Sequence, residues 1–240
     1  MYRSEQEARN ALFEVGRRWL GCNEKDGSHM KIINVYNKKK PLPRGYKVQR
    51  RDSWCATFVS AVAIAAGMDD IIPRECSCPK MIGLFQKMGR WQENDGYTPE
   101  RGDIIFYDWQ DSGKGDNRGS SDHVGIVYGV SNNTITVLEG NKRDRVEYRF
   151  IAKNGRFIRG FGLPDYSKKC LHAGDIVMFS GVKHYTSNTT SGKAKPCKPG
   201  KAKVTYTVKG AHPVHLITVP GSESTVYGYV DLKDVTKIKE

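Results

Sequence analysis

The hydrophobic period changes once along the chain, near residue 100, and this change constrains the fold more than any other feature. Before it, apolar residues recur at helical spacing in the segments 4–20 and 55–66. After it come short β-branched and aromatic runs separated by turn residues, at 102–107, 123–128, 134–139, 146–150 and 157–161. Helices followed by an antiparallel meander predict an α+β domain.

The helical half carries recognisable start and stop signals. Ser4 and Glu7 have the spacing of a capping box, and Gly21 is placed to end that helix. A further short helix is expected over 79–88, because Pro79 suits the first helical turn. The segment 23–51 has no clear period and contains lysines and prolines, which predicts an extended loop.

Cys55 lies where a buried helix is expected to begin. Asp52 or Ser53 is the expected cap of this helix, and Gly67 is the expected stop. A thiol in a first helical turn experiences the positive end of the helix dipole, which favours the nucleophilic thiolate. The alternative is that Cys55, next to Trp54, is only a small apolar core residue.

The other cysteines do not suggest a disulfide framework in a chain of 240 residues with six cysteines. Cys76 and Cys78 have C-x-C spacing, which could be half of a zinc site, but no second pair of ligands stands nearby. We therefore expect free structural thiols, no metal site and no cofactor.

His123 and Glu139 are the candidate partners of Cys55. Cysteine hydrolases need a base for the thiol proton and a polar group that orients the base. A hairpin that pairs 123–130 with 134–139 brings the start of one strand beside the end of the other. The predicted hairpin thus makes His123 and Glu139 neighbours, although a single histidine at a strand start is more often structural.

The segment from Leu163 to Asp165 is the expected boundary between two domains, 1–164 and 165–240. Beyond it only strand-like runs remain, at 175–179, 203–208, 214–219 and 226–230, interrupted by a lysine-, glycine- and proline-rich loop over 192–201. This pattern predicts a small all-β barrel.

The net charge of +13 implies an anionic partner. The last 75 residues hold 12 lysines, no arginine and five acidic residues, a net charge of +7. Because arginine supplies the forked donors used in base and phosphate recognition, its absence favours diffuse attraction to a polyanion over sequence-specific reading of nucleic acid.

The amino-terminal sequence is charged and has no apolar segment behind it, so no ordinary secretory signal is expected. No apolar run approaches the length needed to cross a bilayer. We expect a protein made in the cytoplasm that is not inserted into a membrane and does not leave by the usual export route.

Four motifs in order resemble the CHAP family, the cysteine, histidine-dependent amidohydrolases/peptidases. They are Ser53 to Val59, Arg101 to Phe106, Asp122 to Val127 and Leu138 to Asn141. The resemblance implies a papain-like fold that cleaves amide bonds of bacterial peptidoglycan. It also implies roles for Cys55 as nucleophile, His123 as base, and Glu139 with Asn141 as orienting groups.

Some phage members of this family carry an acidic calcium loop before the cysteine. Here the equivalent stretch, Tyr46 to Arg51, offers mainly positive charge, so calcium dependence is not expected. Trp54 and Trp109 are candidates for lining the substrate groove, with core packing as the alternative for each.

The C-terminal motifs around residues 173–179, 184–187, 212–217 and 226–230 resemble bacterial SH3-like wall-binding modules. On the strands of such a barrel, His184, His212 and His215 are expected to pack or to contact glycan rather than to bind metal. The two resemblances together imply a phage or prophage endolysin that acts on peptidoglycan and anionic wall polymers after release. The alternatives are an NlpC/P60-type peptidase and a non-catalytic wall-binding protein.

Overall fold

The computed structural model describes residues 1–94, 96–113 and 117–238. These residues form two compact units, one of Arg9–Asp165 and one that combines Met1–Ala8 with Tyr166–Glu240. We call them the larger and the smaller unit. The smaller unit therefore includes the first eight residues, which the sequence analysis placed with the first domain.

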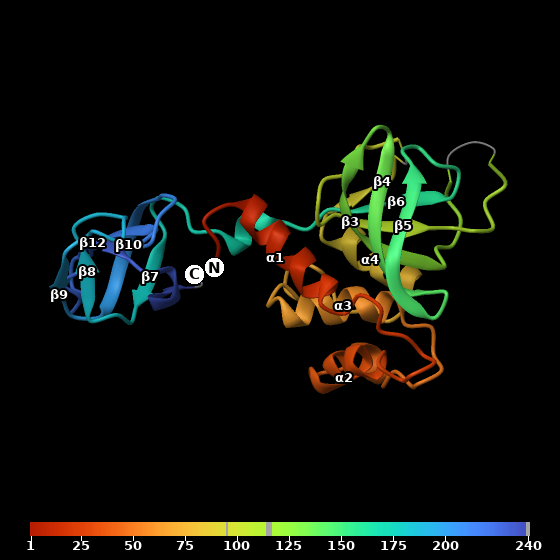
Figure 1. Ribbon diagram of the computed structural model, residues 1–240, viewed down its shortest axis with the longest axis horizontal. Coiled ribbons are helices and arrows are strands. Elements are labelled where there is room, and N and C mark those ends of the chain that lie inside the picture. The colour runs from red at the N-terminus through yellow and green to blue at the C-terminus, as the bar shows by residue number, and fades with distance from the viewer. Residues whose placement is uncertain (95, 114–116, 239–240) are drawn as a thin grey trace. The chain divides into compact units, whose positions relative to one another are not determined.

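The larger unit contains a six-stranded antiparallel sheet in the order β1-β6-β2-β3-β4-β5 (Figure 1). Its strands are β1 (Trp91–Gln92), β2 (Ile104–Tyr107), β3 (His123–Ser131), β4 (Thr134–Lys142), β5 (Arg145–Ala152) and β6 (Ile158–Gly162). All five predicted β-runs are strands, and the mixed helix and antiparallel-sheet content agrees with the α+β prediction. The polar segment 111–121 contains three glycines, which predicts a flexible loop, and it lies partly outside the described residues.

The helices of the larger unit are α1 (Glu5–Arg17), α2 (Met30–Lys38), α3 (Cys55–Ala65) and α4 (Cys78–Lys87), with a short 3-10 turn η1 (Pro43–Gly45). Helix α1 begins within the residues of the smaller unit. Helix α3 packs on β3 and β4, and α2 packs on α3 (Figure 1). Nine consecutive residues of α3, from Cys55 to Ala63, are buried, so this helix is covered on all sides rather than on one face.

The expectation of an extended loop over 23–51 was wrong, because α2 lies within it. Ile32, Ile33 and Tyr36 bury one side of this helix. The stripe spans little more than one turn, and contact with α3 supplies stability that local periodicity does not reveal.

The ends of the helices follow the predicted signals in part. The Ser4 hydroxyl accepts a hydrogen bond from the backbone N–H of Glu7 (3.3 Å), as a capping box requires. Gly67 follows α3 with φ +66°, a left-handed conformation in which glycine lacks the strain of other residues. The cap predicted for α3 was wrong, since Trp54 occupies that position without a side-chain cap. The Asp52 carboxylate instead accepts hydrogen bonds from Gln49 N (2.7 Å) and Tyr46 OH (2.8 Å).

The smaller unit is built on a seven-stranded antiparallel sheet in the order β13-β7-β10-β11-β12-β8-β9. The strands are β7 (Ile176–Phe179), β8 (Lys183–Tyr185), β9 (Ala194–Pro196), β10 (Gly200–Thr207), β11 (Val214–Thr218), β12 (Tyr227–Val230) and β13 (Val235–Lys237), with 3-10 turns η2 (Tyr166–Lys169) and η3 (Leu232–Asp234). The predicted loop over 192–201 contains β9 and the start of β10, because pairing with β8 and β7 overrides its loop-like composition. Across the described residues no ladder joins β13 to β9, so a closed SH3-like barrel stays a prediction.

Alternating side chains of this sheet form an apolar core. The buried cluster includes Val177, Phe179, Val204, Leu216 and Val230. Their neighbours along the strands face outward, which is the period-two pattern of a sheet with one covered face. Throughout the part of the chain that the structure describes, no helix is both long enough and apolar enough to span a membrane.

Candidate active site

Cys55 is the first residue of α3 and its side chain is buried, with 4% of the residue exposed. Because no side chain caps α3, the first N–H groups of the helix stay available near this sulfur. They place partial positive charge where a thiolate forms.

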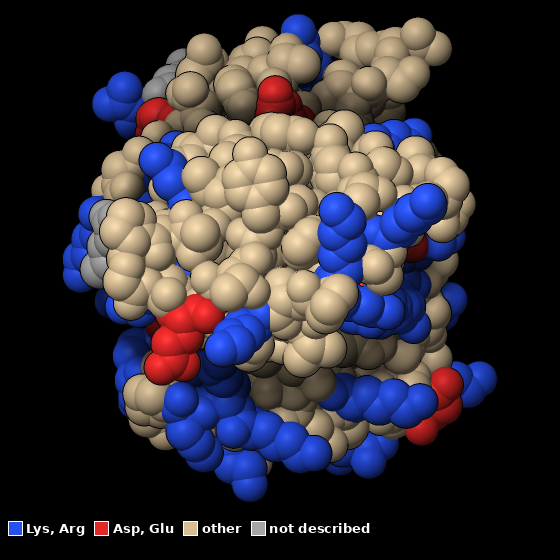
Figure 2. All heavy atoms as spheres, turned by 90° about the vertical axis from the view of Figure 1, so that its left-hand side faces the viewer, with Lys and Arg blue, Asp and Glu red and all other residues tan. Residues whose placement is uncertain are grey.

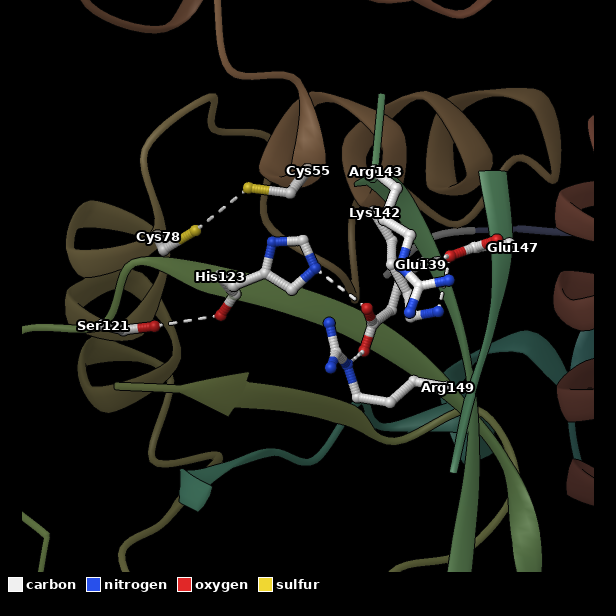
Figure 3. Close-up of polar contacts among 9 residues, drawn as sticks. All are labelled: Cys55, Cys78, Ser121, His123, Glu139, Lys142, Arg143, Glu147 and Arg149. Atoms are coloured by element: carbon white, nitrogen blue, oxygen red, sulfur yellow. Dashed lines mark hydrogen bonds and ion pairs between the residues drawn. The ribbon is translucent and has the colours of Figure 1, made fainter. Parts of the chain in front are cut away.

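His123 begins β3 and lies opposite Tyr107 of β2. Its Nε2 lies 3.0 Å from Oε2 of Glu139 on β4, so the predicted closeness of His123 and Glu139 is confirmed (Figure 3). Gly125 faces Glu139 across the ladder, and a Cβ at this glycine would lie 2.7 Å from Glu139 Cγ. The missing side chain therefore leaves room for Glu139 to reach the histidine.

Glu139 is fully buried and joins two cationic partners. Its Oε2 faces His123, and its Oε1 accepts a hydrogen bond from Arg149 Nε on β5 (2.7 Å). Burial raises the pKa of a carboxyl group, but the hydrogen bonds and charges of His123 and Arg149 outweigh it, and the pKa of Glu139 is lowered. The carboxylate is therefore held ionised beside the imidazole.

A second thiol lies beside Cys55. Cys78, the first residue of α4, places its Sγ 3.6 Å from Cys55 Sγ, and Figure 3 shows the two sulfurs directed toward each other. The hydrogen bond from Cys78 lowers the pKa of Cys55 well below its ordinary value despite burial, and a hydrogen bond with His123 adds to the effect. The same contact raises the pKa of Cys78, so Cys78 keeps its proton and donates it.

The pKa of His123 shifts in the opposite direction to that of Cys55. Burial acts to lower the pKa of His123, but hydrogen bonds with Cys55 and Glu139 raise it to about 9. A lowered cysteine pKa and a raised histidine pKa describe a thiolate–imidazolium ion pair at neutral pH. This pair can deliver a nucleophile and a proton donor to the same substrate bond.

The two tryptophans named from the sequence have different positions. Trp54 has no exposed surface and donates a hydrogen bond through Nε1 to Glu24 (2.9 Å), so of its two alternatives the structure shows core packing rather than a place in a groove. Trp109 is partly exposed, and its ring stacks on Tyr107 at 4.8 Å and lies 6.2 Å from the His123 ring. Trp109 thus remains beside the site.

Asn141 has φ +57° near the end of β4 and is partly buried. Within the described ranges no hydrogen bond joins Asn141 to His123, whereas Glu139 makes that contact directly. The structure therefore brings together Cys55, His123 and Glu139 and leaves Asn141 outside the hydrogen-bonded set.

Three residues of the site were not predicted from the sequence. Arg149 anchors Glu139, and Cys78 contacts Cys55. The Ser121 hydroxyl lies within hydrogen-bond distance of the carbonyl oxygens of Tyr107 (2.9 Å) and His123 (3.1 Å), which fixes the start of β3. The sequence offers a signal for Arg149, because β5 follows β4 and pairs with it, which brings residues of β5 beside Glu139. It offers none for Cys78, because the contact of Cys78 with Cys55 joins the starts of two separate helices.

No cluster of three or more His, Cys, Asp or Glu that could hold a metal ion occurs within residues 1–94, 96–113 and 117–238. Cys76 and Cys78 do not point to a common site: Cys76 Sγ accepts a hydrogen bond from Arg44 (3.5 Å), and Cys78 contacts Cys55. His212 and His215 make hydrogen bonds to Asp231 and Thr205, respectively.

Comparison with known proteins gives three results. No curated protein matches the chain. Two similar solved structures are Ly7917 with the hydrolyzing product of MDP (12% identity, 98% of each chain covered, TM-score 0.36) and Ly7917 (13% identity, 98% of this chain and 97% of that chain, TM-score 0.35). Residues 45–141 match the family model of the CHAP domain. The matched segment contains Cys55, His123 and Glu139, so the part of the chain that carries the candidate site is similar to a CHAP domain.

Proposed function

We propose that this protein is a peptidoglycan hydrolase that cleaves an amide bond through a cysteine thioester. The observation that carries the proposal is the buried Cys55, His123 and Glu139 set within the segment that matches the CHAP domain. The pKa of Cys55 is lowered and that of His123 is raised, which are the directions that a cysteine hydrolase needs at neutral pH.

In the proposed mechanism the Cys55 thiolate attacks the carbonyl carbon of the scissile amide. The oxygen becomes negatively charged in this step, and the proposed donor to it is the backbone N–H of Cys55 at the start of α3. The His123 imidazolium then protonates the leaving amine, and a thioester remains on Cys55. His123 next removes a proton from water, which hydrolyses the thioester.

Glu139 keeps the imidazole in a single orientation during both steps. Because its Oε2 faces His123 Nε2, the other ring nitrogen is left to exchange protons with Cys55 and the substrate. Arg149 fixes the second oxygen of the carboxylate, so Glu139 cannot turn away without breaking a 2.7 Å hydrogen bond in a buried position.

The finer parts of the proposal concern the substrate and the biological role. The bond is either the N-acetylmuramoyl-L-alanine amide or an amide of the stem or bridge peptide, and the larger unit has a papain-like arrangement of a helix-borne cysteine against a sheet-borne histidine. The role proposed is that of a phage or prophage endolysin, made in the cytoplasm and acting on the wall after release.

The smaller unit is proposed to be an SH3-like wall-binding module. Aromatic side chains form a row across four strands, since Tyr206 lies opposite His215, His215 opposite Tyr229, and Tyr229 opposite Tyr185. Tyr227 on the same strand as Tyr229 is 69% exposed. Residues 166–240 hold 12 lysines and five acidic residues, and Figure 2, viewed from the side of this unit, shows basic side chains on the surface. Aromatic rings and surrounding positive charge suit sugars of an anionic wall polymer.

The nucleophile assignment is tested by alkylation. Iodoacetamide at mildly acidic pH reacts with thiolates, so Cys55 should be modified first among the six free cysteines. We expect the rate of wall clearing, measured by turbidity, to fall in proportion to the Cys55 that is carbamidomethylated. Full clearing activity in a chain whose Cys55 is completely alkylated would contradict the proposal.

A further inference from the structure

The contact between Cys55 and Cys78 has a geometry that the proposed hydrolysis does not require. Their sulfurs lie 3.6 Å apart, each at the first position of a separate helix, and only 4% and 5% of the two residues is exposed (Figure 3). A disulfide has a sulfur–sulfur distance of about 2.05 Å, so the two atoms need to approach by roughly 1.5 Å. Both side chains already point toward each other, and the cysteines are in the reduced state.

The two thiols differ in protonation, as a pair consisting of an attacking and a resolving cysteine requires. The hydrogen bond and the His123 imidazolium favour the thiolate of Cys55, whereas Cys78 keeps its proton. Thiolates react with peroxides and thiols do not, so Cys55 is the sulfur that is oxidised first. Cys78 is then the nearest thiol to the oxidised sulfur.

We propose that Cys55 and Cys78 form a reversible disulfide when the protein meets a hydroperoxide, and that this bond switches the site off. The loss of hydrolysis rests on the proposed function, whereas formation of the disulfide does not. In the disulfide the Cys55 sulfur is bonded to Cys78 and no thiolate is left for His123 to pair with.

The reaction balances in two steps. The Cys55 thiolate attacks one peroxide oxygen, the O–O bond breaks, and Cys55 becomes a sulfenic acid while hydroxide or alkoxide leaves and takes up a proton. The Cys78 sulfur then attacks the Cys55 sulfur, the S–O bond breaks, and the Cys78 proton leaves with the hydroxide as water. The two thiols lose two electrons, the peroxide gains them, and an added dithiol returns the pair to the reduced state.

Cys76 provides a matched control, because it is only two residues from Cys78 but has different contacts. Its sulfur accepts a hydrogen bond from Arg44 Nη2 (3.5 Å), and burial raises its pKa. A thiol in this setting is not directed at Cys55, so Cys76→Ser should leave the disulfide unaffected.

The experiment treats the reduced full-length protein with hydrogen peroxide at increasing molar ratios. Remaining thiols are then alkylated, the chain is digested without reductant, and the peptides are weighed. We expect a cross-linked peptide pair containing Cys55 and Cys78, lighter than the sum of the two by two hydrogen atoms. Wall clearing should fall in step with this product and return after dithiothreitol.

Two variants separate the switch from general oxidation. In Cys78→Ser the hydroxyl cannot form a disulfide, so Cys55 should proceed to sulfinic acid and the lost activity should not return with dithiothreitol. In Cys76→Ser the cross-link and the recovery should match those of the unchanged chain.

The outcomes also separate this inference from the proposed function. A Cys55–Cys78 cross-link without loss of clearing would support the disulfide and refute Cys55 as the nucleophile. Oxidation of Cys55 to sulfenic or sulfinic acid in the unchanged chain without any cross-link to Cys78 would overturn the inference, as would a cross-link to Cys76 in place of Cys78.

Discussion

The two units differ in what they bury. The larger unit buries several charged or titratable groups, among them His123, Glu139, Asp103 and Glu75, and pairs each with a specific partner. In the described residues of the smaller unit no charged side chain is buried, and the exposed side chains include Tyr206, Tyr227 and several lysines. Buried charge is costly unless it is paired, so its presence marks the unit in which chemistry is expected. Exposed rings and lysines fit the wall-binding role proposed for the other unit.

Replacement of Cys55 should give the largest effect. Cys55→Ala removes the nucleophile while deleting one small atom from the core, so we expect wall clearing to fall by at least about 10³-fold. Wall binding by the same variant, measured by co-sedimentation, should be unchanged because the aromatic row lies in the other unit. A variant that loses binding together with lysis would contradict the assignment of lysis to the larger unit and wall binding to the smaller unit.

Glu139→Gln should have the next largest effect. His123 and Arg149 both donate to this carboxylate, and an amide has only one acceptor oxygen, so one donor would face an NH₂ group. We expect about 10²-fold slower clearing, against about 10³-fold or more for His123→Ala.

Glu147 is the matched control for that variant, because it lies directly opposite Glu139 in the β4–β5 ladder but pairs with the partly buried Lys142 instead of His123. Glu147→Gln should clear walls at nearly the unchanged rate. Equal losses in the two variants would mean that general charge in this ladder, rather than the contact with His123, governs the activity.

The pH dependence should report the ion pair. The pKa of His123 is raised from 6.5 to about 9, so the protonated ring stabilises the folded chain fully below about 6.5, and this stabilisation is lost as pH rises through about 9. Activity should fall over the same upper range, because the neutral ring cannot protonate the leaving amine, by about tenfold per pH unit.

The lower limb of the profile should follow protonation of Cys55, whose pKa is lowered. Initial clearing rates on one wall preparation, with unfolding followed in parallel, check both limbs. A rate that keeps rising above pH 10 while the chain stays folded would contradict the assigned roles.

The smallest effect is expected at the aromatic row. Tyr227→Ala in the Cys55→Ala background should weaken wall binding by about fivefold, the scale of one aromatic contact. Phe150→Ala is matched in exposure, since Phe150 is 70% exposed and Tyr227 is 69% exposed, but Phe150 lies in the larger unit. Equal weakening by both would indicate nonspecific hydrophobic adsorption.

Local sequence signals predicted the strands and the closeness of His123 and Glu139. Each β-run is rich in β-branched and aromatic residues and is bounded by turn residues, and a tight hairpin determines which residues face one another across it. A helix stop at Gly67 was likewise predictable, because a left-handed conformation is required there.

Features that depend on distant contacts were not predictable in this way. Helix α2 is stabilised by α3, and β9 is defined by its pairing with β8. Cys78 lies 23 residues from Cys55, and nothing in the spacing indicates that two helix starts meet. The burial of Trp54 follows from its packing near Gly140, where a Cβ would lie 3.0 Å from the indole. Each of these depends on tertiary packing that single-sequence periodicity does not contain.

The central claim, that Cys55 makes the protein an amide-cleaving peptidoglycan hydrolase, is tested most directly by mass analysis of the fragments released from purified peptidoglycan. The account predicts fragments with new amino and carboxyl ends from the unchanged chain, and none from Cys55→Ala. Fragments with new reducing sugar ends, or the same amide products from Cys55→Ala, would contradict it.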